Sequence, residues 1–334
     1  KEGTTKATQA ADGIIKERQG AAMLGKTLLI ANPAARSGKA AEVAAHAKTV
    51  LERIREKNAE ALPSFALRYT AGPKDATNIA ATEGDAFDTV IALGGDGLAN
   101  EVANGLMRLD PAARPQFTLI PCGNGDDFAR TIQMDRNPAK SLQQLESLSL
   151  KPTCIDAGNV NGTWFLETLS FGLDAAIALG TAELRKKTRR TGTSLYLQCG
   201  IDQLVNHRDI RYGMLSLDDG DAREIEFYLL AVQNGISYGG GFQICPEAKL
   251  TDGLLDICYA TPTLSASAAV KLLLKAKKGK HTRHPNLTFM KARKLHLSLH
   301  APLPTQVDGE ALPSTEYEVS LHPKQLTVLM PAER

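Results

Sequence analysis

The chain has 334 residues, which is long for one domain and sufficient for two, each with its own hydrophobic core. Its 39 basic and 37 acidic side chains leave a net charge of +2, which excludes a strongly charged chain and does not indicate a nucleic-acid partner. Five dispersed cysteines without a C-x-x-C pair indicate neither a zinc site nor a disulfide framework, so a reduced, cytoplasmic protein is expected. No apolar run reaches the roughly 18 residues of a membrane span. Contact with a membrane is therefore expected at its surface only.

Residues 1–25 precede the regular pattern and are set apart as an extension of the fold or an expression remnant. Over residues 26–152, short apolar runs alternate with helical stretches, which predicts a doubly wound α/β domain with a mainly parallel sheet. The strands are expected at 27–31, 65–69, 89–93 and 117–120, and the helices at about 37–58, after Asp75, at 98–109 and from about Asp127.

Beyond Pro152 the pattern changes to short strands between Gly, Asp and Pro turns, which predicts an antiparallel β-sandwich over residues 153–322. The C-terminal segment 323–334 follows, and a return to the first domain is one arrangement for it. Strands are expected at 164–169, 213–217, 225–234, 254–259, 294–300 and 317–321, with helices at 174–187 and 264–278.

Two glycine-rich loops follow neighbouring strands of the first domain, Gly94-Gly95-Asp96-Gly97 and Gly123-Asn124-Gly125-Asp126-Asp127. Ligands of open α/β sheets bind at the carboxyl ends of the strands. Glycine lets the backbone approach a phosphate closely, and the amides at the start of the next helix attract an anion. Because a carboxylate repels phosphate unless a cation lies between them, Asp96 indicates Mg²⁺. Two tight turns of an α/β fold are the alternative explanation.

Longer motifs connect these loops to a known family. The segments Asn32-Pro33 with Ser37-Gly38-Lys39, GGDG-x-x-NEV-x-NGL from Gly94 to Leu106, and P-x-G-x-x-x-D-F-A-R from Pro121 to Arg130 resemble the catalytic domain of diacylglycerol and sphingosine kinases. The resemblance continues through Asp156-Ala157-Gly158, Asn234-Gly235, Tyr238 to Gly241, Pro246 to Asp256, and Asp308-Gly309-Glu310. It covers about residues 26 to 330 in order and is closest to the soluble bacterial diacylglycerol kinases.

The resemblance implies an NAD-kinase-like first domain, a lipid-kinase β-sandwich, and transfer of the γ-phosphoryl group of ATP to a lipid hydroxyl. It implies a diacylglycerol-like substrate at a membrane surface, with Mg²⁺ as the metal. Asp308 would be the general base, Glu310 would help to place Mg-ATP, and Asp96 would belong to the Mg²⁺ network. The implied nucleotide-binding residues are Asn32, Gly94, Gly95, Asp96, Gly97, Asn100, Glu101, Gly123, Asn124 and Asp127. Asp-Gly is also a common tight turn, so Asp308-Gly309 has a structural alternative.

The stretch from Lys249 to Leu254 resembles a segment that holds a second, structural Mg²⁺ in these kinases. The ligands would be the Asp252 carboxylate and the carbonyl groups of Lys249 and Leu254, a donor set that suits a hard cation. A hairpin turn at Asp252-Gly253 is the alternative.

Two basic clusters would attract an anionic bilayer, and a solvated helix face is the alternative explanation for each. The first cluster holds Arg185, Lys186, Lys187, Arg189 and Arg190, and the second holds Lys271, Lys275, Lys277, Lys278, Lys280 and Arg283. The sequence leaves the oligomeric state open, although exposed edge strands would permit a homodimer.

Three residues depart from the family pattern, and all are expected beside the nucleotide. Leu98 stands where Thr is usual, and Asn124 and Asp126 replace a Thr or Ser and an Asn. These departures motivate a second hypothesis, a non-catalytic lipid-binding or regulatory protein on the same scaffold. A third is a kinase of a soluble substrate, such as NAD kinase, which shares GGDG and the following Asn-Glu. The segments from Tyr238 to Asp256 and from Asp308 to Glu310 favour the lipid kinases.

Overall fold

The first part of the chain forms the predicted parallel sheet. The computed structural model describes residues 23–188, 193–206, 209–261 and 265–332. Four parallel strands lie in the spatial order β2-β1-β3-β4, and all residues of β1 and β3 are buried, as expected for strands covered on both faces. The strands are β1 (Thr27–Ala31), β2 (Phe65–Tyr69), β3 (Thr89–Gly94) and β4 (Gln116–Pro121).

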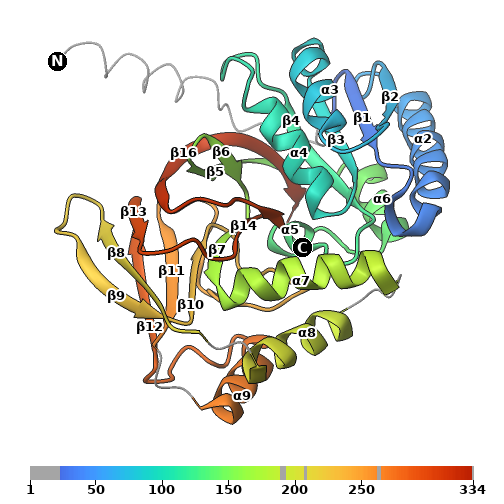
Figure 1. Cartoon of the computed structure of the whole chain (residues 1–334). Helices are drawn as coiled ribbons and strands as arrows, with labels where there is room; N and C mark the ends of the chain where they lie inside the picture. The colour runs from blue at the N-terminus through green and yellow to red at the C-terminus, as the bar shows by residue number, and fades with distance from the viewer. Residues whose placement is uncertain (1–22, 189–192, 207–208, 262–264, 333–334) are drawn as a thin grey trace, which may run out of the picture.

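Helices lie on both sides of this sheet, with α2 and α6 on one side and α3 and α4 on the other (Figure 1). The helix α2 buries a stripe of small and branched side chains at helical spacing, from Ala40 to Ile54, which packs against the sheet. The helical elements are η1 (Ala35–Gly38), α2 (Lys39–Lys57), α3 (Asp75–Glu83), η2 (Gly84–Ala86), α4 (Asp96–Leu106), α5 (Asp127–Thr131) and α6 (Pro138–Glu146). The predicted α/β alternation is therefore confirmed.

The second part of the chain is a sandwich of two β-sheets with a shared core. Its antiparallel sheet has the order β12-β11-β10-β7-β14-β15, and the strands β16, β13, β8 and β9 of the longer sheet lie against it. Phe171 and Tyr317, one from each sheet, pack edge to face in this core. The strands are β5 (Leu150–Val160), β6 (Thr163–Phe165), β7 (Thr168–Gly172), β8 (Arg211–Leu217), β9 (Arg223–Phe227), β10 (Leu229–Gln233), β11 (Leu255–Ala260), β12 (Leu287–Ala292), β13 (Lys294–Leu299), β14 (Thr305–Val307), β15 (Glu310–Ala311) and β16 (Glu316–Pro331).

The strand β16 joins the two parts of the molecule. It pairs with β13 at its start, with β5 along most of its length, and with β4 of the parallel sheet through Val328 and Phe117. The hydroxyl group of Thr118 also donates a hydrogen bond to Leu329 O at 2.9 Å. The longer sheet consequently continues from the α/β part into the sandwich, and residues 323–331 lie beside the first part.

Several elements differ from the sequence-based expectations. The strand expected at 225–234 is two strands separated by Tyr228, and the strand expected at 164–169 is interrupted at Leu166 and Glu167. The helix α7 (Leu173–Thr188) was predicted, and α9 (Ala266–Ala276) was predicted apart from Leu264, which lies outside the described residues. The helix α8 (Thr193–Asn206) was not predicted. These three helices lie together at one end of the sandwich (Figure 1). None of the described helices is long and apolar enough to cross a bilayer.

Asp156 fixes the junction between β5, the loop before β11 and the bulge of β16. Its side chain is buried, and its two oxygens accept hydrogen bonds from Gly253 N at 2.8 Å and Lys324 N at 2.9 Å. Its own backbone N–H donates to Leu250 O at 2.7 Å. The residue therefore has a structural role at some distance from the glycine loops.

We predict that Asp156→Ala destabilises the protein by about 1–3 kcal/mol, because the backbone N–H groups of Gly253 and Lys324 lose their acceptor at a partly buried junction. Urea unfolding followed by circular dichroism measures the change in the free energy of unfolding. Asp219→Ala is the control, since Asp219 is exposed and lies in the turn after β8. Equal stability of the two variants would contradict the assigned role of Asp156.

Candidate active site

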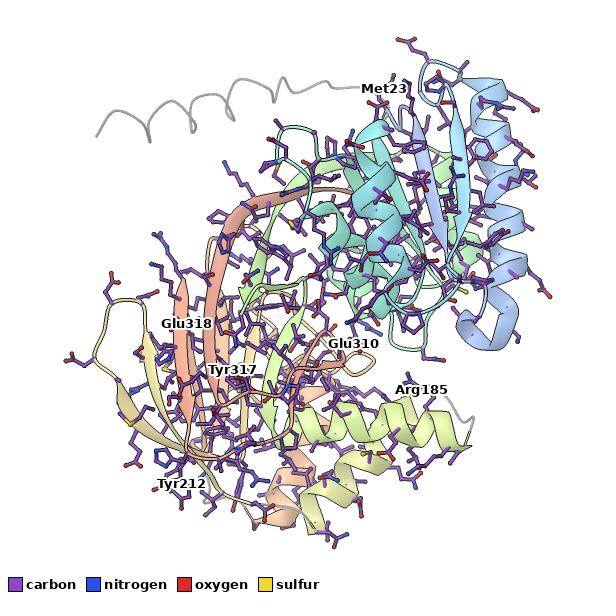
Figure 2. The ribbon with its side chains drawn as sticks, turned by 45° about the horizontal axis from the view of Figure 1, so that its top comes forward. Met23, Arg185, Tyr212, Glu310, Tyr317 and Glu318 are labelled. Carbon is purple, nitrogen blue, oxygen red and sulfur yellow. The ribbon has the colours of Figure 1, made fainter. Side chains whose placement is uncertain are left out.

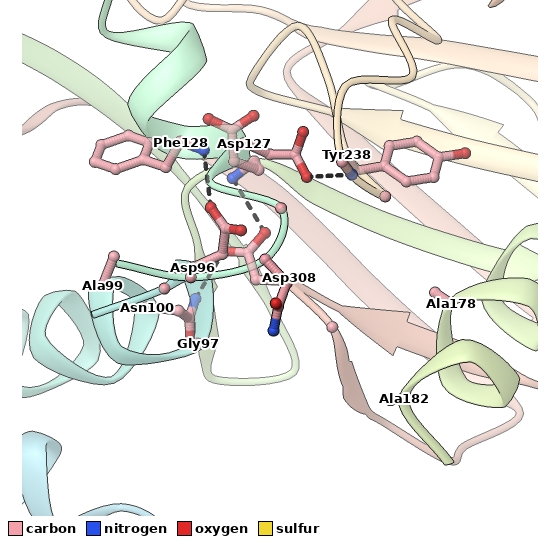
Figure 3. A pocket seen from close by; sticks show the side chains of 18 of the residues that line it. Asp96, Gly97, Ala99, Asn100, Asp127, Phe128, Ala178, Ala182, Tyr238 and Asp308 are labelled. Carbon is pink, nitrogen blue, oxygen red and sulfur yellow. Dashed lines mark hydrogen bonds between the residues drawn. The ribbon is translucent and has the colours of Figure 1, made fainter. Parts of the chain in front are cut away.

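A cavity of about 400 Å³ lies where the α/β part, the sandwich and α7 meet. Ten of the residues predicted from the sequence line it, namely Asn32, Gly95, Asp96, Gly97, Asn100, Gly123, Asn124, Asp127, Asp308 and Glu310. Gly94 and Glu101 are not part of its lining, although both belong to the elements that form it. Figure 3 shows Asp96, Asn100, Asp127 and Asp308 converging on one side, with Ala178 and Ala182 of α7 on the other.

The two glycine loops touch each other, which explains their composition. A Cβ atom on Gly95 would lie 2.9 Å from Gly123 Cα, and one on Gly123 would lie 2.5 Å from Gly95 Cα. Neither position accepts a larger residue without moving the backbone. The contact brings the N-termini of α4 and α5 to the same cavity, where the partial positive charge at the start of α4 favours an anion.

Asp96 and Asp127 form the acidic centre of the cavity. Phe128 N donates a hydrogen bond to Asp96 Oδ1 at 3.0 Å, which orients the Asp96 carboxylate across the gap between the loops. Asp127 accepts hydrogen bonds from Gly240 N at 2.7 Å and Ser237 Oγ at 3.2 Å. Burial, followed by the charge of Asp127, raises the pKa of Asp96 to about 7, and burial also raises the pKa of Asp127.

These two carboxylates fit a divalent cation that is held together with phosphate. Two close carboxylates in a half-enclosed cavity repel each other, and a cation removes this repulsion. The nearest opposing charge is Arg130, whose NH1 atom donates to Asp127 Oδ1 at 2.7 Å. Within the described ranges, no group of three or more His, Cys, Asp or Glu side chains is arranged as a metal site. Asp96 and Asp127 would therefore complete a metal site only together with ligands from a nucleotide.

Asp308 is both a turn residue and a site residue. It has a φ angle of 44° and precedes Gly309, with a φ angle of 91°, in the two-residue turn between β14 and β15. Its carboxylate accepts four hydrogen bonds, from Asn100 Nδ2 at 2.7 Å and from the backbone N–H groups of Leu166, Glu167 and Thr168 at 2.8–3.1 Å. The turn and the catalytic explanations considered for Asp308-Gly309 are thus compatible. Glu310 follows on β15, is exposed, and faces the same cavity (Figure 2).

The residues that depart from the family pattern have local packing roles. Asp126 is buried with a φ angle of 51°, and its Oδ1 atom accepts a hydrogen bond from Gly123 N at 2.8 Å. It therefore closes its own loop. The Leu98 side chain is buried against Gly94, where a Cβ atom would lie 2.6 Å from Leu98 Cδ2. Asn124 lines the cavity.

Glu167 is a site residue that the sequence analysis did not identify. It is 4% exposed, lines the cavity, and accepts a hydrogen bond from Thr131 Oγ1 at 3.0 Å through Oε2. Its Oε1 atom is buried and has no hydrogen-bond partner in the described part of the chain. Burial, together with the charge of Asp308, raises the pKa of Glu167 well above its ordinary value. The available signal was a single charged residue inside the apolar run from Trp164 to Leu169.

Arg36 and Arg185 bring positive charge to the cavity, and the sequence analysis did not place either of them there. Arg185 extends from α7, and its Nε atom is buried with no hydrogen-bond partner among the residues described (Figure 2). Burial lowers its pKa, and the charge of Asp96 opposes this shift. The first basic cluster is therefore divided, since Arg185 faces the cavity and Lys187 pairs with Glu183 at 2.6 Å. Arg189 and Arg190 lie outside the described residues, as does the Lys186 side chain.

The second basic cluster lies mostly at the surface of α9 and the loop after it. Lys271 and Lys275 are exposed on α9, and Lys278 is exposed beyond its end. The ammonium group of Lys277 lies 6.0 Å from the centroid of the Phe242 ring, a cation–π arrangement. None of these lysines lines the active-site cavity.

The predicted second metal site lies away from the cavity. Lys249, Asp252 and Leu254 precede β11 and are not part of the cavity lining. The ammonium group of Lys291 lies 3.1 Å from Asp252 Oδ2. A cationic side chain thus forms an ion pair with the one carboxylate that would bind the metal.

Family comparisons agree with this two-part architecture. Residues 26–160 match the model of the diacylglycerol kinase catalytic domain, and residues 167–330 match the YegS C-terminal NAD kinase beta sandwich-like domain. A crystal structure of a diacylglycerol kinase from Bacillus anthracis superimposes with a TM-score of 0.74 at 25% identity, over 91% of this chain and 96% of that one. The fold and the site thus define a protein of the diacylglycerol kinase type.

Curated relatives narrow the assignment. A probable lipid kinase YegS-like from Pseudomonas aeruginosa is 30% identical over 296 residues, which cover 85% of this chain and 93% of the relative. One from Chromohalobacter salexigens is 29% identical over 308 residues, which cover 92% and 94%. The chain belongs to the YegS-like lipid kinase family.

The raised pKa of Asp96 predicts a pH-dependent stability of the ligand-free protein. Because the folded-state pKa of about 7 exceeds the ordinary value of 3.8, this group stabilises the fold at low pH and loses the contribution as the pH rises from about 4 to 7. The Asp96→Asn variant carries no such charge. The Tm of this variant relative to the wild type should rise between pH 5 and pH 8, by an amount that reflects about 3 kcal/mol. A Tm difference that does not change with pH would contradict this assignment.

Proposed function

We propose that the protein transfers the γ-phosphoryl group of Mg-ATP to a hydroxyl group of a lipid, with a diacylglycerol-like acceptor as the expected substrate. The observation that carries this proposal is the cavity of about 400 Å³ in which both glycine loops and the Asp308 turn meet. Phosphoryl transfer depends mainly on positioning and on neutralising charge. The carboxylates, arginines and helix N-termini around this cavity are groups that could do both.

The nucleotide phosphates are proposed to lie against the glycine loops. The amide groups at the N-terminus of α4 would donate to them, and Arg36 and Arg185 would offset their charge. Asp96 and Asp127 would hold the Mg²⁺ of the nucleotide, which supplies further charge neutralisation during transfer. Arg130 and Gly240 N would keep Asp127 in place for this role.

The lipid acceptor is proposed to enter from the side of α7 and α8. A second cavity of about 80 Å³ lies there, and its lining is mainly apolar, with Leu173 and Ile177 from α7 and Leu272 and Leu273 from α9. Tyr196 lines both cavities. A short apolar part of the acceptor in this cavity would therefore lie close to the phosphate site, and its burial would contribute to binding.

Asp308 is proposed as the general base, the role that the family resemblance implies. The three backbone N–H groups and Asn100 hold its carboxylate in one orientation, from which an oxygen can also accept the proton of an approaching hydroxyl. Glu310, on the other side of the turn, would help to place Mg-ATP. Both residues come from the sandwich, so catalysis would need groups from each part of the molecule.

The direct experiment is an assay with radiolabelled ATP, Mg²⁺ and an extracted lipid mixture. Label on a lipid, and none on NAD, would support the proposal, and the labelled species would identify the acceptor. Tight binding of Mg-ATP without transfer to any lipid would favour a regulatory protein on the same scaffold. A protein with no measurable affinity for Mg-ATP would exclude a kinase.

We predict that Asp308→Asn lowers kcat for lipid phosphorylation at least about 100-fold, because an amide cannot accept the proton. Its one oxygen can accept only two of the four hydrogen bonds, so the Tm should fall, though by less than in Asp308→Ala, while the affinity for Mg-ATP should stay close to that of the wild type. Asp308→Ala is the comparison. It leaves three backbone donors unpaired and should also lower stability by about 1–3 kcal/mol. Turnover retained by Asp308→Asn would remove Asp308 from the role of base.

We also predict that Arg185→Gln raises the KM for ATP about tenfold or more, because a charged hydrogen bond to phosphate is lost. The effect on kcat should be smaller. Lys187→Gln is a matched control, since Lys187 lies on the same helix, pairs with Glu183, and does not line the cavity. Steady-state kinetics with varied ATP measure both variants, and equal KM values for the two would refute a phosphate contact by Arg185.

A further inference from the structure

The loop before β11 carries a charged cluster that is separate from the active site. Asp256 on β11 and Lys291 on β12 are directly opposite each other in the antiparallel pairing of these strands. The Lys291 ammonium lies 3.1 Å from Asp256 Oδ2 and 3.1 Å from Asp252 Oδ2. A single cation therefore bridges the strand carboxylate and the loop carboxylate.

The carboxylate that a metal in this loop would need is already in contact with two groups of the protein. Asp252 Oδ2 faces Lys291, and Asp252 Oδ1 accepts a hydrogen bond from Leu254 N at 3.2 Å. Mg²⁺ requires close octahedral coordination at about 2.0–2.1 Å. At either oxygen it would share the carboxylate with one of these two donors, and it would lie close to the positive charge of Lys291.

The surroundings favour the side-chain cation. The Asp256 side chain is only 10% exposed, so an unpaired charge there would be unfavourable. The Lys291 side chain is 38% exposed and lies on β12 at a position fixed by strand pairing. Asp156 holds the adjacent part of the loop through Gly253 N and Leu250 O. The loop conformation is thus supported from both sides by groups of the protein itself.

We propose that the Lys291 ammonium replaces the structural divalent cation that the family resemblance predicts at residues 249–254, so that this loop keeps its conformation without a metal. The inference does not depend on the proposed kinase activity, because it concerns a site outside the active-site cavity. It distinguishes this chain from relatives in which the loop binds Mg²⁺, since the charge of the metal is supplied here by an amino acid.

The test is the thermal unfolding of the full chain without nucleotide, in EDTA and in millimolar MgCl₂. Mg²⁺ should change the Tm of the wild type and of Asp252→Asn by the same amount. Any Mg²⁺ that stabilises the protein would then be bound outside the loop 249–254, for example in the acidic active site. Lys291→Met should lower the Tm in EDTA by about 2–6 °C and should regain part of it in Mg²⁺. The double variant Lys291→Met/Asp252→Asn should show no such regain.

Two further variants separate the bridge from general charge effects. Lys291→Arg keeps a cation in place and should behave as the wild type does. Lys249→Met removes a positive charge from the same loop and should leave the Tm unchanged. Lys249 is exposed, and its side chain makes none of the ion pairs found in the described ranges. The proposal is overturned if wild-type stability depends on Mg²⁺ and Asp252→Asn abolishes that dependence. This comparison needs no Lys291 variant, so it decides the matter even if Lys291→Met fails to fold.

Discussion

The carboxylate of Asp308 connects the two parts of the molecule at the point where the cavity forms. It accepts one hydrogen bond from Asn100 on α4 of the α/β part and three from the backbone at the break between β6 and β7. The same Asn100 Nδ2 atom and Asn104 Nδ2 both donate to Trp164 O. These contacts hold the sandwich against α4, so the distance between the glycine loops and the Asp308 turn depends on them.

The charges around this junction are balanced only partly by the protein. Asp96, Asp127, Glu167 and Asp308 all have raised pKa values, chiefly because of burial, and their mutual repulsion adds to the shift for Asp96 and Glu167. Arg130 neutralises one of them, while Arg185 has a buried Nε atom without a partner in the described chain. An acidic centre flanked by arginine side chains is a suitable environment for a metal–polyphosphate complex. Repulsion among the buried carboxylates thus lowers the stability of the ligand-free protein, and binding of a metal–nucleotide complex could restore it.

Much of the fold followed from the sequence because local patterns determine it. The buried runs of β1, β3 and β4 were predicted within one or two residues, as were the glycine loops that follow β3 and β4. Periodicity and turn residues are local signals. Ten of the predicted residues line one cavity, and those of the two glycine loops meet there because the loops follow neighbouring parallel strands. Glu167 and Arg185 were missed because their positions depend on packing between distant segments. Likewise, no local pattern shows that Lys291 lies beside Asp252, which is 39 residues away in the sequence.

We propose that one assembled site, built from both parts of the chain around Asp308, performs the transfer. A double-mutant cycle of Asn100→Ala and Asp308→Asn, measured as kcat for transfer of labelled phosphate to lipid, tests it most directly. If Asn100 acts by holding the Asp308 carboxylate, the double variant should be no slower than the slower single variant. Losses that multiply in the double variant would show that the two residues act independently and would contradict a site organised around this hydrogen bond.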